Sequence, residues 1–320
     1  MVRDLFNDAL NAPPGQLAEV LINRIARGDG SEIPDDLRAR LDRLIDAPGK
    51  LGLLARVRLA AGVPYLFDRA PNWTMSRLIP LFNWSSRDAA DVWSARKYSG
   101  YVGSPELFGL VKQPFLQMFG RSDTPAEDLR FFAEWLTAIL IANQAHNVGY
   151  PLLATEARSA LRLAGARALP SVGHHLAIEM ERATEDQKLG HWRAVVAPVF
   201  QGIWPLDVEL QTPAATFKLV QILLATGAAF PEACDIIIPF IRPEDAHSHT
   251  TVFSITRAGD ALYEAAPSKM LNLIAAVIGE APPGSVYGLG KALSRLRAID
   301  AELANTRKFQ NLATCASPHD

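Results

Sequence analysis

The sequence predicts an all-α fold of stacked antiparallel helical hairpins, arranged as a HEAT-like α-solenoid or a plainer multi-helix array. Three observations lead to this prediction. Apolar residues recur at helical spacing, helix start signals recur about 20 residues apart, and the strongly β-branched run at residues 235–239 contains a proline that a central strand would not tolerate. Two helices of this length make a unit of roughly 40 residues, the size of HEAT-type repeats.

Four apolar stripes follow the i, i+3, i+4, i+7 spacing that places side chains on one face of a helix. We expect each stripe to be the buried face of an amphipathic helix, and residues 235–239 to be a buried helical segment. The stripes consist of Leu17, Val20, Leu21 and Ile25; Leu37, Leu41, Leu44 and Ile45; Phe132, Trp135, Leu136, Ile139 and Leu140; and Phe217, Val220, Leu223 and Leu224.

Helix starts are marked by hydroxyl residues that directly precede a proline. Ser104, Thr124 and Thr212 each do so. A serine or threonine side chain can accept a hydrogen bond from the free N–H groups of the first turn, and proline is favoured at the first helical position because its missing N–H would have no partner there. The sequence therefore predicts helices that begin near these three residues.

The composition argues against several classes of protein. Hydrophobic residues make up 49%, and 32 basic residues against 34 acidic ones give a net charge of −2, which offers no general attraction to nucleic acid or anionic lipid. The two cysteines, Cys234 and Cys315, make neither a disulfide framework nor a zinc set, and Cys234 lies in an apolar context typical of a core thiol. The first residues do not resemble a signal peptide, and no apolar stretch approaches the ~20 residues of a membrane span. We expect a cytoplasmic protein with no cofactor and no membrane contact.

Aromatic residues are concentrated between residues 65 and 119, a segment that holds 11 of the 26 aromatic side chains and that prolines interrupt. We expect short helices with irregular connections there. The polar link at residues 120–124 is the best candidate for a boundary. We therefore predict an N-terminal helical sub-domain over residues 1–120, which includes the aromatic segment, and a helical-hairpin array over residues 124–320.

Five aromatic residues of this segment are candidate partner-binding residues: Trp73, Trp84, Trp93, Tyr98 and Tyr101. The segment forms a bulky local core, a contact surface for a protein, or a stacking surface for single-stranded nucleic acid. Nearby acids offset its basic residues, which suits desolvation at a protein interface better than phosphate binding. The protein-contact interpretation predicts that at least two of the five side chains are substantially exposed to solvent.

Two groups of histidines are weak metal-site candidates. His174 and His175 are neighbours on a predicted helix and point about 100° apart, and the i, i+4 pair of His175 and Glu179 lacks further ligands. His247 and His249 lie in a polar stretch beside two carboxylates, where a solvated loop is the ordinary interpretation. The sequence also lacks the serine-hydrolase elbow, the H-E-x-x-H motif and a complete phosphate loop. We predict no catalytic, cofactor-binding or metal-binding residues.

Several N-terminal motifs resemble a known protein family. They are Ala9-Leu10-Asn11-Ala12-Pro13-Pro14-Gly15-Gln16-Leu17-Ala18-Glu19, Pro64-Tyr65-Leu66-Phe67-Asp68, and Asn72-Trp73-Thr74 running into Leu78-Ile79-Pro80-Leu81-Phe82-Asn83-Trp84. Mainly over residues 5–120, the chain resembles a C-terminal helical domain of unknown function attached to bacterial sirtuin-like proteins of anti-phage defence. The resemblance implies the non-catalytic region of a larger protein, in which a sirtuin-like domain degrades NAD and the helical region senses infection or holds the assembly. The chain carries no sirtuin-like nucleotide-binding fold, so NAD hydrolysis is not transferred to it.

These observations favour a non-catalytic helical interaction or regulatory module, a sensor or scaffold of a bacterial anti-phage defence protein whose effector domain lies elsewhere. We expect a protein partner, either the effector domain or a trigger that infection produces, and we include contact between copies of the chain. We expect no nucleic-acid partner. Two alternatives stay open: a stand-alone enzyme with a site near His247 and His249, and a nucleic-acid-binding helical scaffold.

Overall fold

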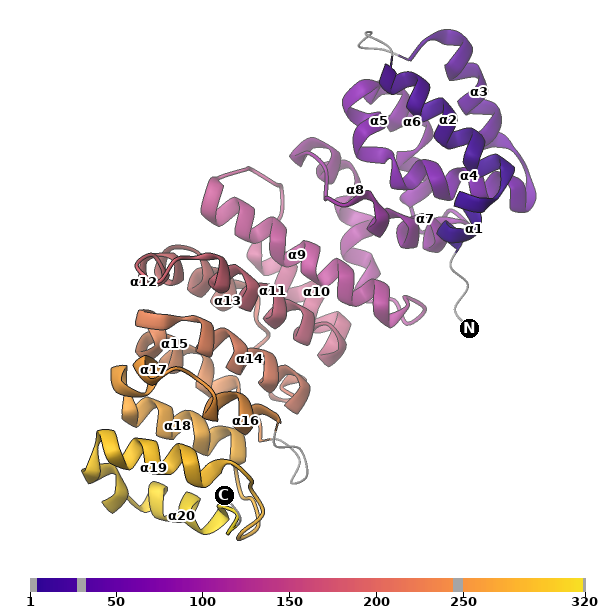
Figure 1. The fold of residues 1–320 in the computed structure, drawn as a ribbon. Coiled ribbons are helices and arrows are strands. Elements are labelled where there is room, and N and C mark those ends of the chain that lie inside the picture. The colour runs from indigo at the N-terminus through magenta and orange to yellow at the C-terminus, as the bar shows by residue number, and fades with distance from the viewer. Residues whose placement is uncertain (1–4, 28–32, 244–249, 319–320) are drawn as a thin grey trace. The chain divides into compact units, whose positions relative to one another are not determined.

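The computed structural model describes residues 5–27, 33–243 and 250–318, and the regular structure in these ranges is helical (Figure 1). No β-strand lies in the described ranges, where an isolated bridge pairs Val286 with Ala316. The prediction of an all-α fold is therefore confirmed. The run at residues 235–239 is helical as expected, because α15 ends at Ile237 and a 3₁₀ turn follows over Ile238–Phe240. The expectation that this run is buried is wrong for most of it, since only Ile237 is buried and Asp235 and Pro239 are exposed.

The chain divides into two compact units. Unit 1 comprises Met1–Trp135 and Val148–Leu152, and unit 2 comprises Leu136–Asn147 and Leu153–Asp320. The division thus falls within helix α9 (Ala126–His146), after the aromatic residues of its first half. The polar link at residues 120–124 belongs to unit 1, where the Thr124 hydroxyl donates a hydrogen bond to the Met118 carbonyl at 3.0 Å.

Unit 1 is built around α4, which contacts α1, α2, α3, α5 and α7. Most of the α4 side chains are buried, which is why this helix shows no single apolar face. The helices of this unit are α1 (Leu5–Asn11), α2 (Pro13–Arg27), α3 (Asp35–Asp46), α4 (Gly49–Ala61), α5 (Val63–Arg69), α6 (Pro71–Arg77), α7 (Ala89–Arg96), α8 (Pro105–Met118) and the first half of α9.

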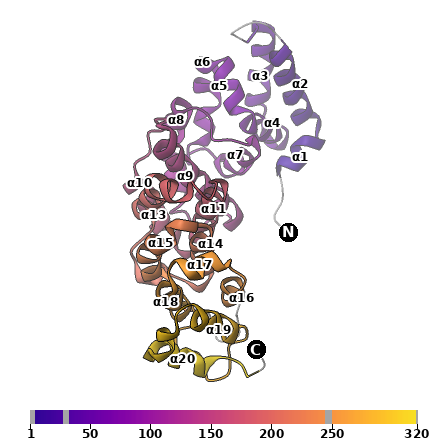
Figure 2. The ribbon, with the colours of Figure 1, turned by 60° about the vertical axis from the view of Figure 1, so that its left-hand side comes forward.

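Unit 2 contains pairs of helices that pack closely. The most extensive pair is α11 and α14, where a Cβ atom added at Gly173 would lie only 2.8 Å from the Cβ of Lys218. Figures 1 and 2 show α18, α19 and α20 side by side. The helices of this unit are the second half of α9, α10 (Ala154–Ala164), α11 (Leu169–Arg182), α12 (Lys188–His191), α13 (Ala197–Ile203), α14 (Pro213–Ala225), α15 (Phe230–Ile237), α16 (Thr250–Thr256), α17 (Asp260–Ala265), α18 (Pro267–Ile278), α19 (Leu289–Ile299) and α20 (Arg307–Cys315).

Two of the predicted helix caps are present as hydrogen bonds. The Ser104 hydroxyl accepts from the Leu107 N–H at 3.2 Å at the start of α8, and the Thr212 hydroxyl accepts from the Ala215 N–H at 3.4 Å at the start of α14. Each removes one unpaired donor from the first turn of its helix.

The apolar stripes match the buried faces unevenly. The second stripe is largely correct, since Leu37, Leu41 and Ile45 are buried. The first is partly wrong: α2 buries Leu21 and Ile25, but it turns Leu17 and Val20 to solvent, where they are 46% and 50% exposed. The small residues Gly15 and Ala18 lie on the buried face in their place, because α1 approaches α2 too closely for larger side chains. A Cβ atom at Gly15 would lie 2.0 Å from the Ala9 carbonyl oxygen.

Membrane-spanning potential is weak in the described residues. No single helix there is long and apolar enough to cross a bilayer, and the one combination that passes, Pro213–Ala225 with Gly227–Phe240, is bent by 114°.

Candidate functional site

A polar cleft of about 600 Å³ in unit 1 lies between α3 and the α5–α6 turn. We call it the arginine cleft, because three of its ten lining residues are arginines. Its lining comprises Ile33, Arg38, Asp42, Arg69, Ala70, Pro71, Asn72, Trp73, Ser76 and Arg77. The lining therefore includes Asn72 and Trp73 of the sequence motif.

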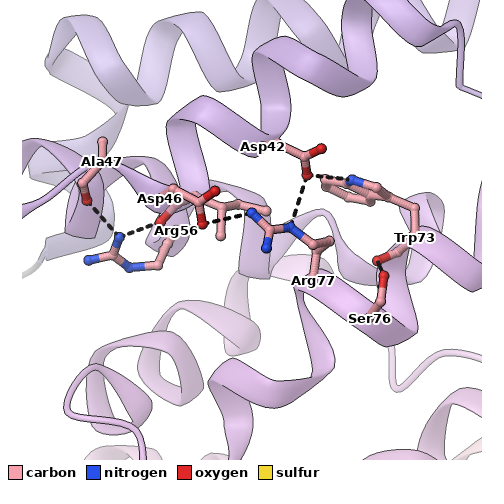
Figure 3. A network of polar contacts seen from close by, with 8 residues as sticks. Asp42, Asp46, Ala47, Arg56, Trp73, Ser76 and Arg77 are labelled. Atoms are coloured by element: carbon pink, nitrogen blue, oxygen red, sulfur yellow. Dashed lines mark hydrogen bonds and ion pairs between the residues drawn. The ribbon is translucent and has the colours of Figure 1, made fainter.

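Helices α3 and α6 contact each other at the wall of this cleft, and each contributes two polar side chains spaced four residues apart. Asp42 and Asp46 lie one turn apart on α3, and Trp73 and Arg77 lie one turn apart on α6. The same Asp42 Oδ1 atom accepts hydrogen bonds from Trp73 Nε1 at 3.0 Å and from Arg77 Nε at 2.9 Å, while Arg77 Nη2 lies 2.7 Å from Asp46 Oδ1 (Figure 3). The hydrogen bond with Asp46 is the main reason that the pKa of the Arg77 guanidinium is raised.

A second network holds α4 in the centre of unit 1. The guanidinium of Arg56, which is buried, donates through Nη1 to the carbonyls of Ala47 at 3.0 Å (Figure 3) and Ile45 at 2.7 Å. It also donates through Nε to Asp88 Oδ2 at 2.7 Å. Gly52 makes this approach feasible, since a Cβ atom there would lie 1.7 Å from the Ala47 carbonyl oxygen and 2.8 Å from Arg56 Nη1.

Three of the five candidate partner-binding residues are packed into unit 1. Trp73 and Trp93 are buried, and Trp84 is half-buried. The indole of Trp93 donates to the Phe82 carbonyl at 2.9 Å, and that of Trp84 donates to the Pro114 carbonyl at 2.7 Å. These tryptophans therefore serve the local core, as one of the three interpretations of the segment supposed.

The other two candidates, Tyr98 and Tyr101, are exposed. Their exposed fractions are 43% and 51%, and we call them the tyrosine surface. The Tyr98 ring is stacked on Phe6 of α1, with ring centroids 4.1 Å apart and an interplanar angle of 9°. Between the two tyrosines the chain turns through Gly100, whose φ of 78° is a conformation that favours glycine. Two of the five side chains thus meet the exposure that a protein-contact surface requires.

A buried arginine fixes the loop that carries the tyrosine surface. Arg96, at the end of α7, is only 3% exposed, and its guanidinium donates to the carbonyls of Tyr101 at 3.1 Å and Val102 at 2.5 Å. It also lies over the Trp135 ring, 4.8 Å from the centroid. Burial lowers the pKa of Arg96 to about 9, so the group stays charged at neutral pH. The charge is satisfied by carbonyl dipoles and an aromatic face, which makes the loop position costly to change.

Glu179 contacts a different histidine from the one that the i, i+4 spacing suggested. The side chain of Glu179 on α11 reaches His191 of α12, with Oε1 3.2 Å from Nε2, and its other oxygen lies 3.2 Å from Arg182 Nη1. Burial is the main cause of the lowered pKa of His175. In the described residues no group of three or more His, Cys, Asp or Glu side chains is placed to hold a metal ion. His247 and His249, with Glu244 and Asp245, lie outside the described residues.

The two cysteines should differ sharply in reactivity. Cys234 is 1% exposed, as the sequence predicted, and burial raises the pKa of its thiol to about 12, whereas Cys315 is only half-buried. About one Cys234 thiol in ten thousand is then ionised at pH 8, and the thiolate is the reactive form. We expect Ellman's reagent at pH 8 to modify Cys315 in the native protein and Cys234 only after denaturation. Rapid modification of two thiols per native chain would contradict this.

Comparison with known proteins gives a distant relative. No protein-family model and no solved structure matches the chain. A protein of Sinorhizobium fredii (strain NBRC 101917 / NGR234), described as uncharacterized protein y4cA, is 22% identical over 327 residues. The match covers 99% of this chain and 26% of that relative, so the chain spans about a quarter of the relative's length.

Proposed function

We propose that the chain is a non-catalytic helical interaction module, a sensor or scaffold that contacts a protein partner through the tyrosine surface. The observation that carries the proposal is the pair of exposed aromatic rings on a loop that a buried arginine holds in place. Tyrosine offers large contact area at low cost in side-chain entropy and is enriched where binding energy is concentrated. Pre-ordering of the loop by Arg96 lowers the entropic cost of binding further.

Local charge favours a protein over a nucleic acid as the partner. Lys97 Nζ lies over the Tyr98 ring, 5.4 Å from its centroid, but it also lies 2.8 Å from Asp128 Oδ1 and 3.3 Å from Glu127 Oε1. An ammonium group that is already paired with two carboxylates contributes little to phosphate binding. The proposal therefore excludes nucleic acid as the partner of this surface.

We further propose that unit 2 is a stack of helical hairpins of the HEAT type. The support is a recurring pattern of contacts between helices two or three elements apart, such as α10 with α13, α11 with α14, and α16 with α18 and α19. Contacts of this kind arise when each helical pair packs on the next. Stacks of this type present extended surfaces to protein partners, which agrees with a scaffold.

We also propose that the chain acts in anti-phage defence and that the effector activity resides in a domain outside it. This rests on the resemblance of the N-terminal motifs to the helical domain of sirtuin-like defence proteins. It is supported by the size of the S. fredii protein, in which the matched region is about a quarter of the polypeptide. Its partner is then the effector domain or a trigger that infection produces.

A test of the proposal is phage plating on cells that carry the encoding locus unchanged, compared with cells carrying the double variant Tyr98→Ala/Tyr101→Ala. We expect the double variant to lose protection, because truncating aromatic anchors costs ~2 kcal/mol or more each at an interface. We expect the purified chain to stay folded with its thermal midpoint lowered by only a few degrees, because Tyr101 is exposed and Tyr98→Ala removes mainly the stacking of one ring on Phe6.

Tyr287→Ala provides the matched control, since Tyr287 is 54% exposed and lies in unit 2. This variant should keep full protection. Full protection by the double variant would exclude the tyrosine surface as the contact site. Absence of protection with the unchanged locus against a broad phage panel would reject the role in defence.

A further inference from the structure

A groove in unit 2 lies where α15, the 3₁₀ turn over Ile238–Phe240, α18 and the start of α20 meet. Its volume is about 470 Å³, and we call it the lysine groove, because its lining includes Lys269 and Lys308. Helix α18 contacts α15, the 3₁₀ turn and α20, and Figures 1 and 2 show it between α15 and α20. Segments that are far apart in the sequence therefore build the groove together.

The polar part of the groove carries a cation that no acid of the groove neutralises. Lys269 is paired with the carboxylate of Asp235, whereas Lys308 donates to the neutral side-chain oxygen of Asn272. Asp235 is the one acid in the lining, and among the described residues no carboxylate lies within ion-pair distance of Lys308. Both lysines lie in the first turn of their helices, where the helix dipole disfavours a cation. A carboxylate on a partner would therefore supply Lys308 with an ion pair that the described chain lacks.

The remainder of the lining is apolar and contains small side chains. The 3₁₀ turn contributes Ile238 and Pro239, and α18 contributes Ala275 and Ala276. Ile238 and the two alanines are only half-buried, so an aliphatic side chain that filled the space beside them would remove apolar surface from water. Ala276 follows Lys269 by seven residues, which places the two on the same face of α18, about 10 Å apart along the helix axis.

We propose that the lysine groove binds a short segment of a protein partner that carries a carboxylate and an aliphatic side chain about 10 Å apart. The carboxylate pairs with Lys308, and the aliphatic side chain packs between Ile238 and Ala276. An extended segment spans this distance with about three residues. A nucleic acid suits the groove less well, because Asp235 lines it and its apolar part holds no aromatic ring on which a base could stack. The proposal is independent of the tyrosine surface, which lies in unit 1.

The test begins with an array of random synthetic peptides incubated with the full chain. We expect the bound peptides to share an aspartate or glutamate and an aliphatic residue at a fixed separation. The tightest of them, labelled with fluorescein, then gives the affinity by fluorescence anisotropy. Lys308→Glu should weaken binding at least tenfold, because it replaces an attraction between charges by a repulsion. Ala276→Leu should also weaken it at least tenfold, because the larger side chain occupies the space for the aliphatic residue.

Lys291→Glu is the matched control, because Lys291 is an exposed lysine in the first turn of α19, outside the groove lining. It makes the same charge change in the same unit and should leave the affinity nearly unchanged. Lys308→Glu should keep the fold, since Lys308 is exposed and an acid is favoured in the first turn of a helix; circular dichroism checks this.

Three results would overturn the proposal. They are the absence of any bound peptide, equal affinity of the unchanged chain and Lys308→Glu for the peptide, and a loss for Lys291→Glu as large as that for Lys308→Glu. Loss of the peptide by Tyr98→Ala/Tyr101→Ala would assign the binding to the tyrosine surface instead. A labelled single-stranded DNA that binds the chain and is released by Lys308→Glu would assign the groove to nucleic acid.

Discussion

Replacement of Arg56 by alanine is expected to destabilise unit 1 by ~3–5 kcal/mol. The change removes the buried cation of the Asp88 carboxylate, whose side chain is only 12% exposed, and leaves it only the exposed Arg87 guanidinium at 3.5 Å. It also removes a donor from the carbonyls of Ile45 and Ala47. Urea denaturation gives the loss of stability. Hydrogen exchange should show faster opening of α3, α4 and α7 and little change in α14.

Two further variants distinguish the loss of a buried ion pair from the general effect of removing an arginine from α4. Arg58→Ala breaks a partly exposed pair with Glu19, 3.3 Å apart, and should cost only ~1 kcal/mol or less. The double change Arg56→Met/Asp88→Leu should recover much of the lost stability, because it leaves no buried charge unpaired. A loss below ~1 kcal/mol for Arg56→Ala would show that the ion pair does not hold α4.

Trp93→Ala is expected to cost ~3–5 kcal/mol, the range typical of a large buried aromatic side chain. The indole is 3% exposed and packs edge-to-face on Phe82 and Phe132, with ring centroids 4.9 and 5.6 Å apart. Truncation opens a cavity and also leaves the Phe82 carbonyl without its N–H donor. Chemical denaturation followed by circular dichroism measures the effect.

Trp135→Ala is the comparison that tests this packing. The apolar stripe of α9 placed Trp135 on a buried face, but the structure shows it half-buried beside Phe131, with its ring against the Arg96 guanidinium. We therefore expect a smaller loss than for Trp93→Ala. An equal or larger loss would mean that the contact between Arg96 and Trp135 carries more stability than the aromatic cluster around Trp93.

Local patterns in the sequence predicted the helices well and the tertiary contacts poorly. The hydroxyls of Ser104 and Thr212 mark helix starts because capping is decided within four residues. The exposure of Leu17 was not predicted, because the closeness of α1 and α2 selects small residues for the buried face. Periodicity gives the faces of a helix but does not say which neighbour will cover each face.

The polar networks could not be predicted from the sequence either, because local spacing does not identify tertiary neighbours. Asp42 and Trp73 are 31 residues apart, and Arg56 and Asp88 are 32 apart, so no spacing rule links either pair. The exposed tyrosines were distinguishable from the buried tryptophans by one local signal, the glycine between them at residue 100. The left-handed conformation of Gly100 ends the helical run that carries Tyr98 and places Tyr101 in the loop that follows.

A π-helical turn at Trp192–Val196 follows His191 directly. The contact between His191 and Glu179 therefore depends on the number of residues in this turn. A π turn accommodates one residue more than an α-helical turn, and each residue of an α-helix rotates the chain by about 100°. A descendant protein that lost one residue of this turn would regain a regular α-helix. If α13 kept its place, His191 would then be rotated away from Glu179. Insertion or deletion of one residue in this turn would therefore disrupt the contact even when both His191 and Glu179 are kept.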